Sequence, residues 1–205
     1  MKDTTAYEKD LASIRTMMER SVKFISLSGL AGVLAGTYAL AGSAFAYFMI
    51  ASTPSRLEDK ALDDAATLAP LIILAAVVLV LSIGTGCLLS WRKAKKIGVP
   101  VWNSTSKQLL IDLLIPLVTG GVLILIFISR GYFALIVPAT LVFYGLALIQ
   151  GGRSTFEEIK YLGFTEIGLG LAAAMLPGYG LAFWSAGFGA MHMIYGALMH
   201  YRYDR

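Results

Sequence analysis

Charged residues are scarce in this chain, at 15% of its 205 residues, whereas hydrophobic residues make up 57%. A water-soluble domain normally carries about a quarter charged residues, so this composition argues against one. Cysteine is almost absent as well. The single Cys87 excludes an intramolecular disulfide, and we interpret it as a packing residue within an apolar segment.

Catalytic motifs are also missing. The chain has no HExxH sequence, no Walker or Rossmann glycine pattern, and no paired-glutamate arginine motif of the membrane prenyl-protease kind after Glu157. Ser185 and His192 share a face of a predicted helix, but the rise of 1.5 Å per residue separates them by about 10 Å, too far for a nucleophile and its base. We therefore predict no enzymatic activity, no catalytic residue and no cofactor.

What the chain does contain is a series of long apolar runs. A helix of about 20 residues crosses the hydrocarbon core of a bilayer. The runs therefore predict an all-α, polytopic membrane helix bundle, with residues 22–205 forming one transmembrane domain. Six spans are predicted, over residues 22–50, 67–91, 108–129, 131–150, 161–178 and 181–200.

The net charge of +4 is compatible with a nucleic-acid partner, but the placement of the basic residues argues against one. Fourteen of the seventeen lysines and arginines fall on one side of the predicted topology. By the positive-inside rule this side is cytoplasmic, which places both termini inside the cell. An even number of spans requires the same. The prediction is a multi-pass protein of the inner, cytoplasmic membrane whose main partner is the lipid bilayer.

Residues 1–21 are predicted to form an amphipathic cytoplasmic helix. Thr5 and Glu8 have the spacing of a capping box, and apolar residues from Tyr7 to Met18 recur at helical intervals. Two interpretations stay open. The helix is either an extension of the first span, packed on the bundle or the headgroups, or a docking site for a cytoplasmic protein partner.

A stripe of small residues runs along the first predicted span, and two glycines one heptad apart lie in the last. In lipid, small side chains allow two helices to approach closely, so we predict that the first span packs on span five or six. Small side chains allow the same close approach between two copies of the chain, so a homo-oligomer is a second possibility. The predicted packing residues are Ser28, Gly32, Gly36, Ala39, Ser43, Gly189 and Gly196.

Most acidic residues lie in predicted loops, tails or helix caps. Ser154 and Glu157, like Thr155 and Glu158, have capping-box spacing, so these glutamates are predicted to cap the helix of span five. The only acidic residues within the predicted spans are Asp112 and Glu166.

Asp112, Glu166 and His192 form the predicted intramembrane polar site. A carboxylate in hydrocarbon costs free energy, and such residues usually face a bundle interior or an ion pathway. Asp112 lies near the cytoplasmic end, where snorkelling to the interface is the alternative; Glu166 is deeper. His192 lies near the middle of the membrane and could pair with Glu166 or relay a proton, the alternative being an ordinary buried, hydrogen-bonded histidine. Met191 and Met193 flank it, but neighbouring helical residues point about 100° apart, so no metal site is predicted.

Three blocks of the sequence resemble a family of uncharacterised bacterial six-span inner-membrane proteins: MMERSVKFISLSGLAGVLAGTYAL, YLGFTEIGLGL and GFGAMHMIYGALMHYRYDR. The resemblance implies a six-span topology. It implies no activity, because none is known for that family.

Two functional hypotheses follow. The first is a small-solute, ion or proton-linked transporter or channel with a polar site in the cytoplasmic half of the bundle. The second is a membrane scaffold or sensor that transports nothing and signals to a cytoplasmic partner through residues 1–21.

Overall fold

The computed structural model describes residues 27–52 and 65–204, and every regular element in these two ranges is helical. The predicted all-α fold is thereby confirmed for this part of the chain. The predicted helix over residues 1–21 lies outside it. The elements are α2 (Gly29–Ala51), α3 (Ala65–Ile97), α4 (Ser104–Arg130), η2 (Phe133–Leu135), α5 (Ile136–Gly151), α6 (Glu157–Met175), α7 (Gly180–Trp184), the π-helix η3 (Ser185–Met191) and α8 (His192–Tyr203).

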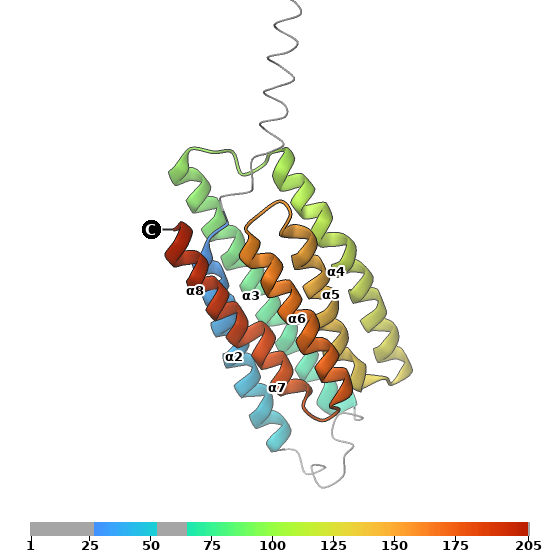
Figure 1. Cartoon of the computed structure of the whole chain (residues 1–205). Helices are drawn as coiled ribbons and strands as arrows, with labels where there is room; N and C mark the ends of the chain where they lie inside the picture. The colour runs from blue at the N-terminus through green and yellow to red at the C-terminus, as the bar shows by residue number, and fades with distance from the viewer. Residues whose placement is uncertain (1–26, 53–64, 205) are drawn as a thin grey trace, which may run out of the picture.

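These elements form rods that run up and down in alternation (Figure 1). We call one end of the bundle the basic end. It holds the start of α2, the end of α3, the start of α4 and the end of α8, together with the basic residues Lys93, Lys107, Arg153 and Arg202.

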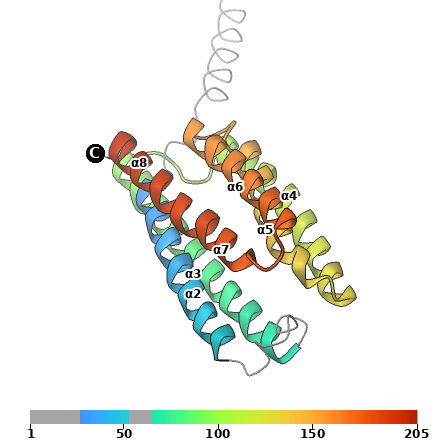
Figure 2. The same ribbon diagram turned by 60° about the horizontal axis from the view of Figure 1, so that its bottom comes forward.

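The rods group into two layers of three. One layer, called the α2 layer, contains α2, α3 and the rod α7–η3–α8, whereas the other, called the α5 layer, contains α4, α5 and α6. Figure 2 shows the two layers on opposite sides of the view, with α7 close to the turn that leaves α6. The layers meet mainly where α6 packs on η3 and α8 and where α5 and α6 pack on α7.

Four helical segments are long and apolar enough to cross a membrane: Gly29–Ala51, Ala69–Ile97, Ser104–Arg130 and Phe133–Gly151. This agrees with the predicted membrane character of the chain. The two remaining rods differ for identifiable reasons. Helix α6 carries Glu157, Glu158, Lys160 and Glu166 within 19 residues, and the last rod is divided by its π-helical turn.

Glycines hold α2 against the last rod. An ideal Cβ at Gly32 would lie 3.0 Å from the Cα of Gly196, and one at Gly36 would lie 2.6 Å from the carbonyl oxygen of Gly189. Side chains larger than hydrogen would therefore push the backbones apart. The partner of the first span is thus the last rod, and Ser43 is buried with its hydroxyl donating to the carbonyl of Ala39.

A second glycine contact holds α5 against α6. A Cβ at Gly145 would lie 2.6 Å from the carbonyl oxygen of Gly163, and one at Gly163 would lie 2.7 Å from that of Gly145. In each layer, two of the three rods are therefore in direct backbone contact.

Candidate functional site

Glu166 lies in the middle of α6 and is fully buried, with 0% of its surface exposed. Neither carboxylate oxygen has a hydrogen-bond partner among the described residues. A buried polar group without a hydrogen bond is costly, by about 1–3 kcal/mol in protein mutational data. Burial of the Glu166 carboxylate is therefore costly, and its presence calls for a functional explanation.

His192 is the nearest titratable neighbour of Glu166. Its Nδ1 atom lies 3.4 Å from Oε1 of Glu166 and 3.0 Å from the carbonyl oxygen of Gly187. A carbonyl oxygen can only accept a hydrogen bond, so Nδ1 carries a hydrogen and donates it to Gly187. Glu166 Oε1 lies on the same side of the ring, at a distance longer than an ordinary hydrogen bond.

Tyr144 on α5 completes the cluster. Its hydroxyl lies 2.7 Å from Nε2 of His192, and the two rings stack with centroids 5.4 Å apart. With Nε2 unprotonated, the tyrosine donates to it. When Nε2 is protonated, the bond reverses direction and the tyrosine oxygen accepts. His192 can therefore take up a proton without losing either hydrogen bond.

The π-helix η3 contains residues that pack around Glu166, His192 and Tyr144. Gly187, within η3, lies directly against Glu166, and a Cβ there would collide with Oε2 of Glu166 and lie 2.7 Å from Cδ2 of Leu141. The rings of Trp184 and Phe188, 5.2 Å apart, continue the aromatic stacking from Tyr144. Short π-helical turns often mark functional sites. Here one provides Gly187, whose lack of a side chain leaves room for Glu166 and whose carbonyl accepts from His192.

The three residues predicted for the polar site do not all meet. Glu166 and His192 come together, but Asp112 is half-buried on α4, which packs on α5 and η2, and it accepts a hydrogen bond of 2.8 Å from Gln108 one turn earlier. Tyr144, which sequence reasoning missed, takes the third place. A tyrosine in an apolar span carries no signal by itself, and only the fold brings it to His192.

A second polar cluster closes the basic end of the bundle around Asp204. Its Oδ2 accepts hydrogen bonds from the backbone N–H of Gly29 at 2.9 Å and from the Ser28 hydroxyl at 3.1 Å. Lys93 lies 2.6 Å from Oδ1, and His200 Nδ1 lies 3.1 Å from Oδ2. The C-terminal Asp204 thus supplies the N-cap of α2, whose own N-cap residue, Ser28, makes no side-chain cap bond.

The charge state of Asp204 links this cluster to pH. Burial acts to raise the pKa of Asp204, but the hydrogen bonds from Lys93, His200 and Ser28 and the charge of Lys93 outweigh it, so the pKa lies below its ordinary value of 3.8. A carboxylate with a lowered pKa contributes stability that is present above the ordinary pKa and is lost as the pH falls through the lowered one.

We therefore expect Asp204→Asn to destabilise the bundle at neutral pH by about 1 kcal/mol, because asparagine keeps an acceptor for the Gly29 N–H but loses the ion pair with Lys93. The difference from the wild type should shrink as the pH falls below 3.8 and through the lowered pKa of Asp204. Thermal unfolding in detergent at a series of pH values measures it. A difference that stays constant with pH would show that the carboxylate charge is not what Asp204 contributes.

The prediction that Ser154 with Glu157, and Thr155 with Glu158, form capping boxes is wrong. Phe156 is the N-cap residue of α6 and makes no side-chain cap bond, and the Thr155 hydroxyl instead donates to the carbonyl of Gly151 at 2.8 Å. The Glu158 carboxylate turns toward α8, where it lies 2.6 Å from the Arg202 guanidinium and accepts from the Tyr203 hydroxyl at 3.1 Å. Burial acts to raise the pKa of Glu158, but its backbone hydrogen bond and these partners lower it below its ordinary value.

Among the residues that the structure places, no group of three or more His, Cys, Asp and Glu side chains is arranged to hold a metal ion. Comparisons with protein-family models, with curated proteins and with solved structures give no match for this chain.

Proposed function

We propose that this protein is a proton-linked membrane transporter in which Glu166 and His192 form the proton-binding site. The observation that carries the proposal is the fully buried Glu166 carboxylate, which lacks hydrogen bonds within the described chain and faces an imidazole nitrogen 3.4 Å away. Polar groups of this kind persist in lipid mainly where they pair with one another or line a pathway for ions or substrates.

The pair is suited to carrying a proton because it has two states of equal net charge. A protonated Glu166 beside a neutral His192, and an ionised Glu166 beside a cationic His192, are both neutral overall. A proton added from outside gives the pair a single positive charge, which the Tyr144 hydroxyl can stabilise by accepting from Nε2 at 2.7 Å. Proton binding therefore changes the charge at the interface between the two layers.

The membrane topology is part of the same proposal. We infer six spans, with α6 and the rod α7–η3–α8 crossing the bilayer beside the four apolar segments, since these rods run antiparallel to their neighbours along the same bundle. The positive-inside rule then makes the basic end cytoplasmic, in a bacterial inner membrane.

The test measures whether Glu166 exchanges protons while the protein is in its native membrane. An apolar carbodiimide reacts with protonated carboxyl groups inside lipid, and mass spectrometry locates the modified residue. We expect Glu166 to be labelled at low pH and labelling to fall as the pH rises. Labelling that is absent at every pH, or does not vary with pH, would contradict the proposal.

Flux measurements complete the test. Proteoliposomes that enclose a pH-sensitive dye, screened with candidate solutes under an imposed potential, should show proton movement in the wild type. We expect Glu166→Gln and His192→Ala to abolish it. The matched control is Glu157→Gln, which removes an exposed carboxylate from the same helix and should leave the flux unchanged. Equal flux in all of these variants would remove the pair from the mechanism.

The scaffold or sensor alternative depends on residues 1–21, which lie outside the described residues. It predicts a protein partner that is lost when residues 2–16 are deleted, while the bundle stays intact. The transporter is preferred because the buried pair gives it support at the level of residues.

A further inference from the structure

The path from the basic end to the Glu166 and His192 pair is filled by side chains from both layers. On α6, Glu158, Leu162 and Glu166 recur every four residues, so they lie on one face of the helix. With a rise of 1.5 Å per residue, Glu158 lies about 12 Å closer to the basic end than Glu166. The side chains packed along this face of α6 therefore separate Glu166 and His192 from solution at the basic end.

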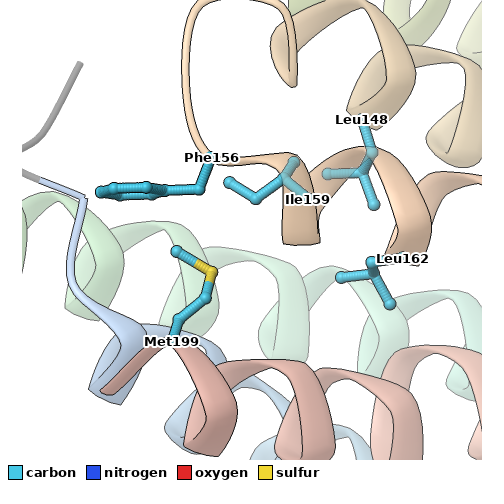
Figure 3. Close-up of a cluster of buried hydrophobic side chains, with 5 residues drawn as sticks. All are labelled: Leu148, Phe156, Ile159, Leu162 and Met199. Atoms are coloured by element: carbon cyan, nitrogen blue, oxygen red, sulfur yellow. The ribbon is translucent and has the colours of Figure 1, made fainter. Parts of the chain in front are cut away.

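The middle of this path is apolar. Leu148, Phe156, Ile159, Leu162 and Met199 form a buried cluster, and Figure 3 shows Met199 reaching from α8 toward Phe156 and Ile159. Tyr144 and Tyr195 pack against it from the side. Since Leu162 lies one turn from Glu166 on the same face, this cluster directly covers the proton site.

The outer part of the path is closed by contacts between the start of α6 and the end of α8. The ring of Phe156 stacks on Tyr203, with centroids 4.2 Å apart and planes 25° apart, and Lys93 Nζ lies 5.8 Å from the Phe156 centroid. Beside this stack, Arg202 and Tyr203 hold the Glu158 carboxylate. These contacts join the α5 layer to the α2 layer.

We propose that Phe156, Glu158, Arg202 and Tyr203 form a gate, which closes the basic end over Glu166 and His192 and opens when α6 separates from α8 at that end. The assignment of the pair as a proton site rests on the proposed function. The gate itself rests on the contacts between the two layers.

The energetics favour opening at this place rather than within a layer. The Arg202 side chain is 62% exposed whereas that of Glu158 is 6% exposed, so water screens the ion pair from the arginine side. Inside the layers, by contrast, glycine contacts bring backbones together at Gly32 and Gly196 and at Gly145 and Gly163. The pair α2 and α8, and the pair α5 and α6, can therefore each move as a unit, and the contacts between the two pairs at the basic end are the ones that part.

The experiment fixes the gate closed with a reducible cross-link. In a Cys87→Ala background, Phe156→Cys and Tyr203→Cys are joined by a short bifunctional methanethiosulfonate, and the single variant Tyr203→Cys treated in the same way is the control. A water-soluble carbodiimide with glycine methyl ester then probes whether water reaches Glu166, as measured by mass spectrometry of its peptide. We expect labelling of Glu166 to fall to background in the cross-linked protein and to return after reduction.

Milder variants keep the test valid where the cysteine pair fails to fold. Arg202→Gln and Tyr203→Phe each remove one partner of Glu158, and both should increase labelling of Glu166. Labelling that is unaffected by the cross-link, or by both single variants, overturns the gate.

The gate and the proposed function can fail separately. A cross-link that controls labelling in a protein without any proton flux supports the gate and refutes the transporter. Proton flux that requires Glu166 but continues through the cross-linked protein supports the transporter and refutes the gate.

Discussion

Glu166→Met is expected to make the bundle more stable and to make it inactive. Methionine fills a similar volume and removes two buried oxygens that have no hydrogen-bond partner in the described part of the chain. His192 keeps its hydrogen bonds to Gly187 and Tyr144, so the substitution leaves no new group unsatisfied. The gain should be about 1–3 kcal/mol, the usual cost of a buried polar group without a partner.

The midpoint of thermal unfolding in detergent measures this gain, and the proteoliposome flux assay measures the loss of proton movement. Glu158→Gln is the matched control, because Glu158 is buried in the same helix but paired with Arg202 and Tyr203. It should lower the midpoint. A lower midpoint for Glu166→Met would mean that Glu166 holds the bundle together, and the functional explanation of its burial would then be wrong.

Gly196→Ala is expected to cause a large loss of stability at the α2 and α8 interface. The new Cβ would lie 2.5 Å from the backbone nitrogen of Val33 and 2.7 Å from the carbonyl carbon of Gly32. Backbone atoms cannot rotate away as a flexible side chain does, so the two helices must separate. Overpacking in well-packed interiors typically costs about 1–3 kcal/mol.

The control for Gly196→Ala is Gly84→Ala on α3. A Cβ at Gly84 meets nothing within 4 Å, and alanine favours a helix over glycine by about 1 kcal/mol. This variant should therefore unfold at or above the wild-type midpoint. Comparable losses at both positions would show that α2 and α8 do not depend on close backbone contact.

Much of the helical architecture could be predicted because hydrocarbon leaves a strong signal in the sequence. The apolar runs located the ends of the rods to within about seven residues. Gly131, with a positive φ of 74°, ends α4 close to the predicted hairpin. The first span was predicted from residue 22, whereas α2 begins at Gly29. The start of α2 is fixed by a residue far away in the sequence, because the Asp204 carboxylate accepts a hydrogen bond from the Gly29 N–H at 2.9 Å.

The candidate site could be predicted only in part. Glu166 and His192 stood out because titratable residues are rare in apolar spans. Asp112 stood out for the same reason, yet it lies on α4 with Gln108 as its partner. Tyr144 and Gly187 could not be identified, since their roles depend on which helices meet and on a π-helical turn that the amino-acid pattern does not encode.

That π-helical turn also changes the phase of the last rod. Its hydrogen bonds run from residue i to i+5 rather than i+4, so it accommodates one residue more than a regular helical turn. One residue corresponds to about 100° of rotation in a regular helix. Rewinding η3 into a regular helix would thus turn Trp184 and Phe188 relative to His192 and Gly196. The π-helical turn therefore sets, within one rod, both the angle of the aromatic stack and the angle of the glycines that face α2.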